Sequence, residues 1–354
     1  MVSTDDLRVG VLGYGIAGAV FHAPLIAATP GLRLSAVVTA NPERQAALRE
    51  RHPDTRVLGS AEDLFAARDE LDLVVVATPN RTHVPLALAA IEAGLPVVVD
   101  KPFAPSAAQA RQLTERAGAA GVPLTVFQNR RWDNDFLTIR KLVQDGRLGR
   151  VHRFESRFER WAPAPWDNWR ELPGAEEAGG ILFDLGAHLI DQALQLFGPV
   201  TSVYAELGQV RAGVQVDDDA FVALTHRGGV RSHLWMSALS AQLGPRFRVL
   251  GDAAGYTKFG LDPQEDAMAA GGIPGSPGWG TEVQSAWGQL GVGAEAEPVP
   301  TEPGAYQDFY AAVVAALRAG GPLPVEPASA IAALEVIEAA KRSAESNEPV
   351  VVTA

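Results

Sequence analysis

Short apolar strands alternate with helix-forming segments over the first 127 residues, and this alternation limits the chain to few folds. The pattern predicts strands near residues 7–12, 32–38, 71–77, 97–99 and 122–127, with helices near 19–27, 82–93 and 106–120. Strands that alternate with helices in this way form a parallel, doubly wound sheet. We therefore expect an α/β domain over residues 1–127.

The first predicted strand runs directly into a glycine-rich turn that is typical of a dinucleotide site. The segment Gly13-Tyr14-Gly15-Ile16-Ala17-Gly18 has the pattern G-x-G-x-x-G between a strand and a helix. The first glycine permits the tight turn, the second lets backbone amides approach a pyrophosphate, and the third lets helix and strand pack closely. The helix amino terminus then faces the anion with its partial positive charge. We expect a Rossmann domain that binds NADP or NAD through this turn.

The end of the second predicted strand indicates which dinucleotide is preferred. An Asp or Glu at this place would bind the ribose 2′-hydroxyl of NAD, but the chain has no acid there. Thr39 and Asn41 can bond a 2′-phosphate and Arg44 can pair with it, so we expect NADP to be preferred. Alternatively, Asn41 caps a helix whose first residue is Pro42, with Arg44 solvated, and both interpretations can hold at once.

A lysine stands at the carboxyl end of a predicted core strand. The run Val97-Val98-Val99 ends abruptly in Asp100-Lys101-Pro102. Open α/β sheets place their ligands in the crevice beyond the strand ends, so Lys101 is a candidate for contact with a substrate. The alternative is that Asp100 and Lys101 form only the polar edge of the strand.

Beyond Phe127 the pattern changes to that of an α+β domain, which we expect over residues 128–354 for substrate binding and oligomerisation. Predicted strands lie near 151–161, 200–210, 217–225, 229–239 and 245–250, predicted helices near 133–143, 305–319 and 327–344, and a long irregular segment at 261–303. Few helices separate the last four strands, so a mostly antiparallel sheet is expected. Helices on one face would leave the other for a homodimer or homotetramer interface.

A second candidate centre lies in the segment 179–191. If this segment is helical, Asp184 and His188 are four residues apart on one face, with Asp191 three further along. An Asp near an imidazole favours its protonated form and fixes its orientation, which prepares a His to move a proton. A divalent metal site and a buried structural cluster are the alternatives. We expect no metal, because Lys101 can supply the positive charge.

Two further segments carry groups suited to a polyol. Asn129, Arg131 and Trp132 follow the last strand of the N-terminal sheet and could bind hydroxyls through hydrogen bonds and an aromatic face. An interdomain salt-bridge cluster is the alternative for this segment. Trp166 lies in a Pro/Trp loop at 161–169 that is well placed to form a wall of a pocket.

Taken together, these motifs resemble those of the Gfo/Idh/MocA family of NAD(P)-dependent sugar and cyclitol dehydrogenases. The resemblance is carried by the glycine turn, Asp100-Lys101-Pro102, the pattern G-G-x-x-x-D-x-G-x-H-x-x-D from Gly179, and the residues Thr78, Pro79, Asn80 and His83. It implies that Lys101, Asp184 and His188 are a catalytic trio and that Thr78 to Asn80, His83, Asp100 and Lys101 lie at the cofactor. Asp100 stands where the family more often has Glu, which leaves its positioning role open.

The segments 21–25, 129–137 and 264–267 further resemble a subgroup that contains NADP-dependent scyllo-inositol 2-dehydrogenases. The resemblance implies hydride transfer between nicotinamide C4 and a ring carbinol or carbonyl carbon of an inositol or sugar. His188 would accept the hydroxyl proton while Lys101 stabilises charge on the oxygen. The alternatives are a reductase of another carbonyl or imine substrate and a non-catalytic regulator that binds NADP and a sugar.

Composition argues against several kinds of partner. The formal net charge is −12, and no long run of Lys or Arg is available to track a phosphate backbone, so nucleic acid is not an expected partner. The absence of cysteine excludes disulfides and thiolate metal sites and fits a reducing cytoplasm. The polar amino terminus is unlike a signal peptide, and no segment has the unbroken apolar length that spans a bilayer.

Overall fold

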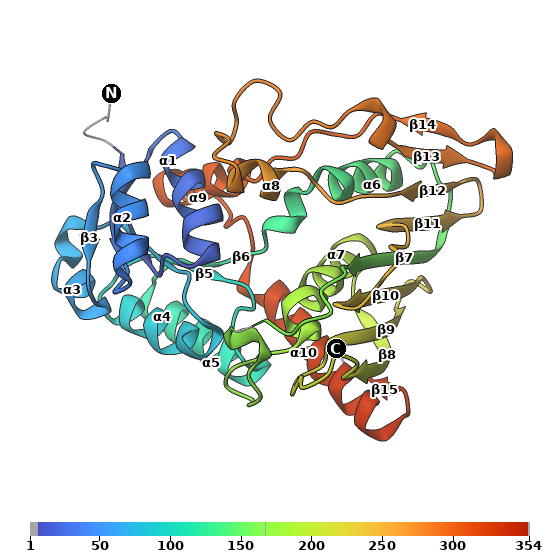
Figure 1. Ribbon diagram of the computed structural model, residues 1–354, viewed down its shortest axis with the longest axis horizontal. Coiled ribbons are helices and arrows are strands. Elements are labelled where there is room, and N and C mark those ends of the chain that lie inside the picture. Colours follow the sequence, from blue (N-terminus) through green and yellow to red (C-terminus); the bar gives the residue numbers. More distant parts are fainter. Residues whose placement is uncertain (1–5, 167, 353–354) are drawn as a thin grey trace. The chain divides into compact units, whose positions relative to one another are not determined.

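The computed structural model describes residues 6–166 and 168–352 (Figure 1). The chain forms two compact units of three segments each, the first Met1–Trp132, Gln264–Trp279 and Ala305–Ile331, the second Asp133–Pro263, Gly280–Gly304 and Ala332–Ala354. Two late segments thus belong to the first unit, and the domain ranges 1–127 and 128–354 stay a prediction. The amino-terminal residues 1–5, used above against a signal peptide, lie outside the described residues, as does residue 167 of the Pro/Trp loop.

The first unit is built on the predicted parallel, doubly wound sheet, which is confirmed. Its strand order is β3-β2-β1-β4-β5-β6, and every neighbouring pair is parallel. The strands are β1 Leu7–Leu12, β2 Leu32–Val38, β3 Arg56–Leu58, β4 Leu73–Val76, β5 Val97–Asp100 and β6 Leu124–Phe127. The strand order reverses between β1 and β4, which is where such sheets bind ligands.

Helices lie on both faces of this sheet, with α1 and α2 on one side and α4 and α5 on the other (Figure 1). The helical elements of the unit are η1 Ala17–His22, α1 Ala23–Ala28, α2 Pro42–Arg51, α3 Ala61–Ala66, η2 Arg68–Glu70, η3 Asn80–Thr82, α4 His83–Glu92, α5 Ala107–Ala120, η4 Asn129–Trp132, α8 Gln264–Ala269 and α9 Gln307–Ala319. Cover on both faces explains why β4 and most of β5 are continuous runs of buried aliphatic residues, mainly valine. Local caps start α2, α3 and α5, where the side chains of Asn41, Ser60 and Ser106 each accept a backbone N–H three residues on.

The second unit contains the mostly antiparallel sheet that was predicted. Its order is β14-β13-β12-β11-β7-β10-β9-β8-β15, and the β7–β10 pair alone is parallel among the described strands. The strands are β7 Val151–Glu159, β8 Val200–Gly208, β9 Asp219–His226, β10 Arg231–Ser237, β11 Phe247–Gly251, β12 Gly255–Lys258, β13 Gly288–Gly291, β14 Glu297–Val299 and β15 Val350–Val351. The hairpin expected at Gly228-Gly229 joins β9 to β10.

The prediction of one long irregular segment at 261–303 is wrong in part, because β13 and β14 lie within it and extend the sheet. These strands have only four and three residues, too few for an alternating pattern to be recognised. Gly288 also packs against the ring of Tyr256, where any side chain would collide with the phenol. The strand conformation of this segment is therefore determined by pairing with β12 and not by local propensity.

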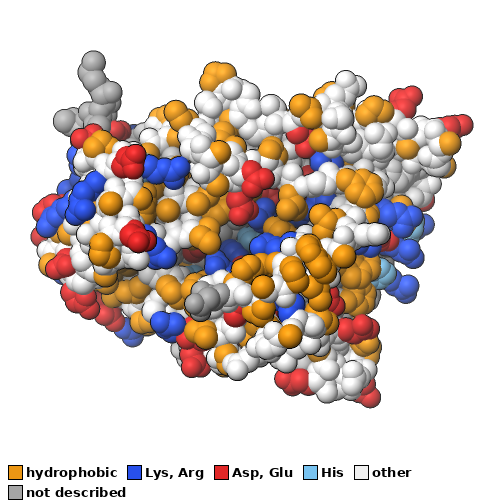
Figure 2. All heavy atoms as spheres, viewed as in Figure 1, with side chains coloured by type: hydrophobic (Ala, Val, Ile, Leu, Met, Phe, Trp, Pro, Cys, Tyr) orange, Lys and Arg blue, Asp and Glu red, His pale blue; other side chains and the backbone are white. Residues whose placement is uncertain are grey.

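The helical elements of the second unit are α6 Asn134–Gln144, η5 Trp169–Glu171, η6 Leu182–Gly186, α7 Ala187–Phe197, η7 Gln284–Ala286 and η8 Gly293–Glu295, and α10 Pro327–Ser346 runs into it from the first unit. α7 packs on β7 and β10 through buried residues that include Leu189, Ile190 and Ala193. Within residues 6–166 and 168–352, no helix combines the length and apolar character required to cross a membrane. On the face of the first unit drawn in Figure 2, acidic and basic side chains are interspersed.

Candidate active site

The three motif glycines face different surroundings. Gly13 has a φ of +100°, and a Cβ there would lie 2.5 Å from the Ala77 carbonyl oxygen. A Cβ on Gly18 would overlap the carbonyl oxygen of Gly13. At Gly15 the nearest atom to such a Cβ is Nη1 of Arg44, at 3.9 Å. The first and third glycines are therefore required by the fold, while the second borders open space of the kind a pyrophosphate needs.

Beside this space, the chain turns into a continuous helical segment made of η1 and α1. η1 is a π-helix, a rare form that is frequent at functional sites. Ile16 is 62% exposed at its start, whereas the ring of Tyr14 is buried. Burial raises the pKa of the Tyr14 hydroxyl. Tyr14 can therefore face a cofactor only with its backbone, while Ile16 and Ala17 border the open side.

The residues after β2 agree both with a helix cap at Asn41 and with a cation available to a 2′-phosphate. Asn41 caps α2 as expected, since its Oδ1 accepts a hydrogen bond from the Arg44 N–H at 3.0 Å. Thr39 is buried and its Oγ1 accepts a 3.4 Å bond from the Asn41 N–H. The Arg44 guanidinium extends toward Gly15, as the 3.9 Å separation above shows. An exposed cation thus lies between the end of β2 and the glycine turn, where the 2′-phosphate of NADP would need one.

The turns that follow β4 and β5 are joined by a buried histidine. His83 Nε2 lies 2.9 Å from the carbonyl oxygen of Thr78, and its Nδ1 lies 2.9 Å from that of Pro102. Burial lowers the pKa of His83, and the nearby Asp100 opposes this effect. Each ring nitrogen faces a carbonyl oxygen, and the one N–H of a neutral ring can be donated to either turn. His83 therefore links the two turns, and its contact with the cofactor stays a prediction. Pro79 and the buried Asn80 lie in the first of these turns.

Asp100 and Lys101 form the turn at the carboxyl end of β5. Asp100 Oδ1 accepts a 2.8 Å hydrogen bond from the Lys101 backbone N–H, and His22 Nε2 lies 3.9 Å from the same oxygen. Burial raises the pKa of Asp100, but His22, His83 and Lys101 together lower it below its usual value. The carboxylate therefore fixes the backbone of the candidate catalytic lysine.

The segment predicted to bind substrate through Asn129, Arg131 and Trp132 forms η4. Asn129 and Arg131 are buried, and Arg131 Nη2 donates to Ser329 Oγ at 2.9 Å. The neighbouring Arg130 pairs with Glu265 at 2.7 Å. These contacts favour the salt-bridge alternative, and Ser329 and Glu265 lie in the same unit as the segment itself. Direct contact with substrate stays a prediction for these residues.

Asp184 and His188 lie in consecutive helical elements of the second unit. Asp184 belongs to the π-helix η6, and His188 and Asp191 belong to α7, where both are buried. The single regular helix assumed from the sequence is thus replaced by a π segment that continues as α-helix. Asp184 Oδ1 lies 3.3 Å from Nε of Arg170. In the described part of the chain, no three His, Asp or Glu residues are grouped to hold a metal.

The second of the paired glycines before η6 makes room for a buried carboxylate. Gly180 has a φ of +92°, and a Cβ there would overlap Oδ1 of Asp217. Asp217 Oδ2 accepts a 2.7 Å hydrogen bond from the Leu182 N–H at the start of η6. Burial raises the pKa of Asp217. Gly180 therefore allows an acid to cap the helix that carries Asp184.

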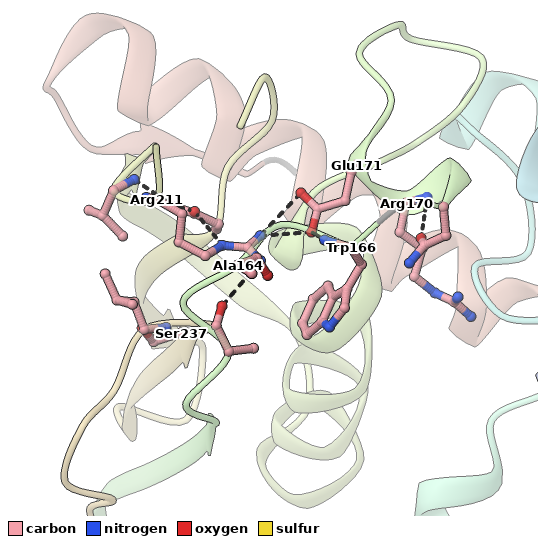
Figure 3. A network of polar contacts seen from close by, with 11 residues as sticks. Ala164, Trp166, Arg170, Glu171, Arg211 and Ser237 are labelled. Atoms are coloured by element: carbon pink, nitrogen blue, oxygen red, sulfur yellow. Dashed lines mark hydrogen bonds and ion pairs between the residues drawn. The ribbon is translucent and has the colours of Figure 1, made fainter. Parts of the chain in front are cut away.

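An ion-pair network that the sequence did not reveal fixes the loop of Trp166 (Figure 3). Arg211 Nη2 lies 2.8 Å from Oε1 of Glu171, and its Nε lies 2.8 Å from Oδ2 of Asp218. The Arg211 guanidinium also lies 4.9 Å from the ring centre of Trp166, with Arg160 at 5.5 Å. A cleft is lined by Trp166, Arg170, Asp184 and Arg211. Trp166, the predicted pocket wall, therefore lies beside Asp184 of the predicted catalytic trio.

Comparison with known proteins now identifies the family. Residues 7–128 match the model of the oxidoreductase family with an NAD-binding Rossmann fold, and residues 136–257 match the GFO/IDH/MocA C-terminal domain. The chain belongs to the Gfo/Idh/MocA family of oxidoreductases. The resemblance inferred from the motifs is confirmed, and so is the NAD(P)-binding Rossmann domain of this family member.

Similar Gfo/Idh/MocA proteins extend over the whole chain. The uncharacterised oxidoreductase YdgJ of Escherichia coli is 42% identical, over 96% of this chain and 97% of its own length. The scyllo-inositol 2-dehydrogenase (NADP(+)) IolW of Bacillus subtilis is 34% identical, over 98% and 96%. The structure of the YPO2259 protein of Yersinia pestis, described as an oxidoreductase, is 40% identical with a TM-score of 0.91, covering 99% of this chain and 98% of that one.

Proposed function

We propose that this protein is an NADP-dependent dehydrogenase that oxidises a ring CH–OH group of an inositol or a related sugar. The proposal rests on one observation above all. The open space at Gly15 and the turn of Lys101 both lie at the carboxyl edge of the same parallel sheet, next to the point where its strand order reverses. The 34% identity to IolW, an NADP-dependent scyllo-inositol 2-dehydrogenase, supports the choice of cofactor and substrate class.

The residues present fit a bound dinucleotide. The backbone from Gly13 to Gly18 would hold the pyrophosphate, and Thr39, Asn41 and Arg44 would surround a 2′-phosphate. When bound, NADP+ supplies the hydride acceptor. In this proposal dinucleotide binding is the role of residues 1–127, and substrate binding and oligomerisation are the roles of residues 128–354.

Three side chains of the protein perform the remaining chemistry in this proposal. His188 accepts the proton of the substrate hydroxyl, and Asp184 orients it. Lys101 bonds the same oxygen and stabilises the negative charge that develops there. Asp184 is itself held by Arg170, from the element that the Arg211 network fixes. Trp166 forms a wall of the substrate cleft.

The test is a screen of cyclitols and aldoses with NADP+ and with NAD+, followed by substitution of the proposed catalytic groups. We expect Lys101→Ala and His188→Ala to lower turnover of the best substrate by about 100- to 1000-fold, as loss of such a group does elsewhere. Lys141→Ala is the matched control, because Lys141 is an exposed lysine paired with Glu302. Near-normal turnover by either variant would show the assignment to be wrong, and NADP binding without turnover on any substrate would favour the regulator.

We also propose that the outer face of the second unit's sheet forms a homo-oligomer interface. On this face Phe221 and Trp235 pack together with ring centres 5.1 Å apart, and the Arg157 guanidinium lies 4.0 Å from the Trp235 ring. Partly exposed aromatic and arginine side chains of this kind are enriched at protein interfaces. Light scattering should give the mass of a dimer or tetramer, and a monomer at all concentrations would contradict the proposal.

A further inference from the structure

We propose that His22, held by Tyr310, is a positioning residue that fixes the Asp100–Lys101 turn and so directs the lysine ammonium at the reacting oxygen. This inference deepens the proposed function and rests on it for the role of Lys101. The residues concerned all lie in the first unit, and His22 and Tyr310 are far from each other in sequence.

His22 is completely buried at the end of η1, directly beneath the turn. Its Nδ1 lies 2.7 Å from the Tyr310 hydroxyl oxygen, and its Nε2 lies 3.9 Å from Oδ1 of Asp100. Its ring also packs against Phe127 of β6, with ring centres 4.4 Å apart. The imidazole is thus held at three sides by groups from three elements.

The chemistry of these partners fixes the protonation pattern of the ring. A neutral imidazole has one donor and one acceptor nitrogen. The Asp100 carboxylate can only accept, so the N–H belongs on Nε2, and Nδ1 accepts from the Tyr310 O–H. At 3.9 Å the Nε2–Asp100 contact is too long for a direct hydrogen bond and acts as an electrostatic contact. Tyr310 therefore selects the tautomer that faces Asp100.

Asp100 passes this constraint to the lysine. Its Oδ1 accepts the Lys101 backbone N–H at 2.8 Å, while His83 holds the Pro102 carbonyl oxygen on the other side of the turn. The titratable groups that act on Asp100 are His22 from η1, His83 from α4, Lys101 from the turn itself and, as a neutral phenol, Tyr310 from α9. Among them, His22 and Tyr310 are the groups that a substitution can remove without touching the turn.

The decisive variants are His22→Leu, which removes both polar contacts, and His22→Gln, which can restore a donor toward Asp100. Tyr310→Phe removes the hydroxyl alone and keeps the ring. We expect His22→Leu to lower kcat by about 10- to 100-fold, since small displacements of a catalytic group have effects of this size. The KM for NADP should change little, because the glycine turn is untouched.

The pH profile separates positioning from mere structural support. Without His22 the buried carboxylate loses one of the groups that lower its pKa, so protonation of Asp100 should contribute to the acidic limb of the kcat profile, beside the proposed base His188, and move that limb to higher pH. His22→Gln should recover most of the kcat and return the limb toward its original place. Tyr310→Phe should shift it in the same direction as His22→Leu, but less.

A second readout does not depend on turnover. Acetic anhydride labelling of Lys101, measured by mass spectrometry relative to Lys141 in the same sample, should be faster in His22→Leu, because the side chain is held less firmly and its uncharged amine reaches the reagent more often. An unchanged labelling ratio in folded His22→Leu, or in Tyr310→Phe where the leucine variant does not fold, overturns the inference. Wild-type protein without turnover on any polyol would instead overturn the proposed function, and the labelling ratio would still decide the inference.

Discussion

Replacing Gly15 by alanine should weaken cofactor binding without unfolding the protein, whereas replacing Gly18 should destabilise the fold. The added Cβ of Gly15→Ala meets only Arg44 Nη1, at an ordinary contact distance of 3.9 Å. Because alanine restricts the unfolded chain more than glycine does, stability should stay constant or rise by about 0.4–1 kcal/mol. In Gly18→Ala the methyl group overlaps the backbone carbonyl of Gly13, which cannot retreat, so a cost of about 1–3 kcal/mol or more follows.

The loss of affinity in Gly15→Ala follows from what the methyl group displaces. The open space beside Gly15 is where the backbone would approach the pyrophosphate, and a methyl group there would separate the two. A hydrogen bond to a charged group contributes about 1.5–3 kcal/mol. Since about 1.4 kcal/mol corresponds to a tenfold change in Kd, the loss of one such bond predicts roughly 10- to 100-fold weaker NADPH binding.

The assay combines Tm from thermal unfolding without cofactor and Kd from titration with NADPH. Gly118→Ala in α5 is the matched control, because no atom lies within 4 Å of the Cβ it would add. It should bind NADPH normally and unfold at an equal or higher Tm. NADPH binding by Gly15→Ala within twofold of the unchanged protein, or an unaltered Tm for Gly18→Ala, would refute the roles assigned to these glycines.

Two further substitutions test the buried charges of the second unit. Asp217→Asn should raise Tm most at alkaline pH, because burial raises the pKa of Asp217 and the fold must bury the charged carboxylate there. As the pH falls, the wild-type carboxyl becomes protonated, and the difference in Tm between the two proteins should shrink. A difference in Tm that does not depend on pH would contradict this account. Arg211→Met should lower the free energy of unfolding in urea by about 3–5 kcal/mol, because it leaves Glu171 and Asp218 buried without their cation. Adding Asp218→Asn should recover part of that loss. A loss below about 1 kcal/mol, the value of a surface ion pair, would mean that the network is not effectively buried.

The sequence predicted those parts of the fold that depend on short-range patterns. The valine run of β5 reads as a buried strand because helices cover both faces of its sheet, and Asn41 and Ser106 act as caps within three residues of their partners. The constraint at Gly18 is equally local, because a Cβ there would meet the carbonyl oxygen of Gly13. For the same reason the glycine turn and the lysine after β5 could be placed at one sheet edge from the strand order alone.

Features that depend on distant partners could not be predicted. Glu171 and Arg211 are 40 residues apart, and neither belongs to a motif, so nothing in the sequence pairs them. The short strand β13 exists because β12 pairs with it, and the burial of Arg131 depends on Ser329, 198 residues away. The π-helical form of η1 and η6 also escaped prediction, because amphipathic spacing does not distinguish a π segment from an α-helix.

The late return of α9 to the first unit has a consequence for biosynthesis. His22 and Tyr310 are separated by 288 residues, which a ribosome translating about 5–20 residues per second needs on the order of tens of seconds to complete. Thr125 in β6 likewise waits for the carbonyl of Val325. The nucleotide-binding unit is thus begun first and finished almost last, so a nascent chain that stops early exposes the apolar surface that α9 would bury and lacks the contact that orients His22.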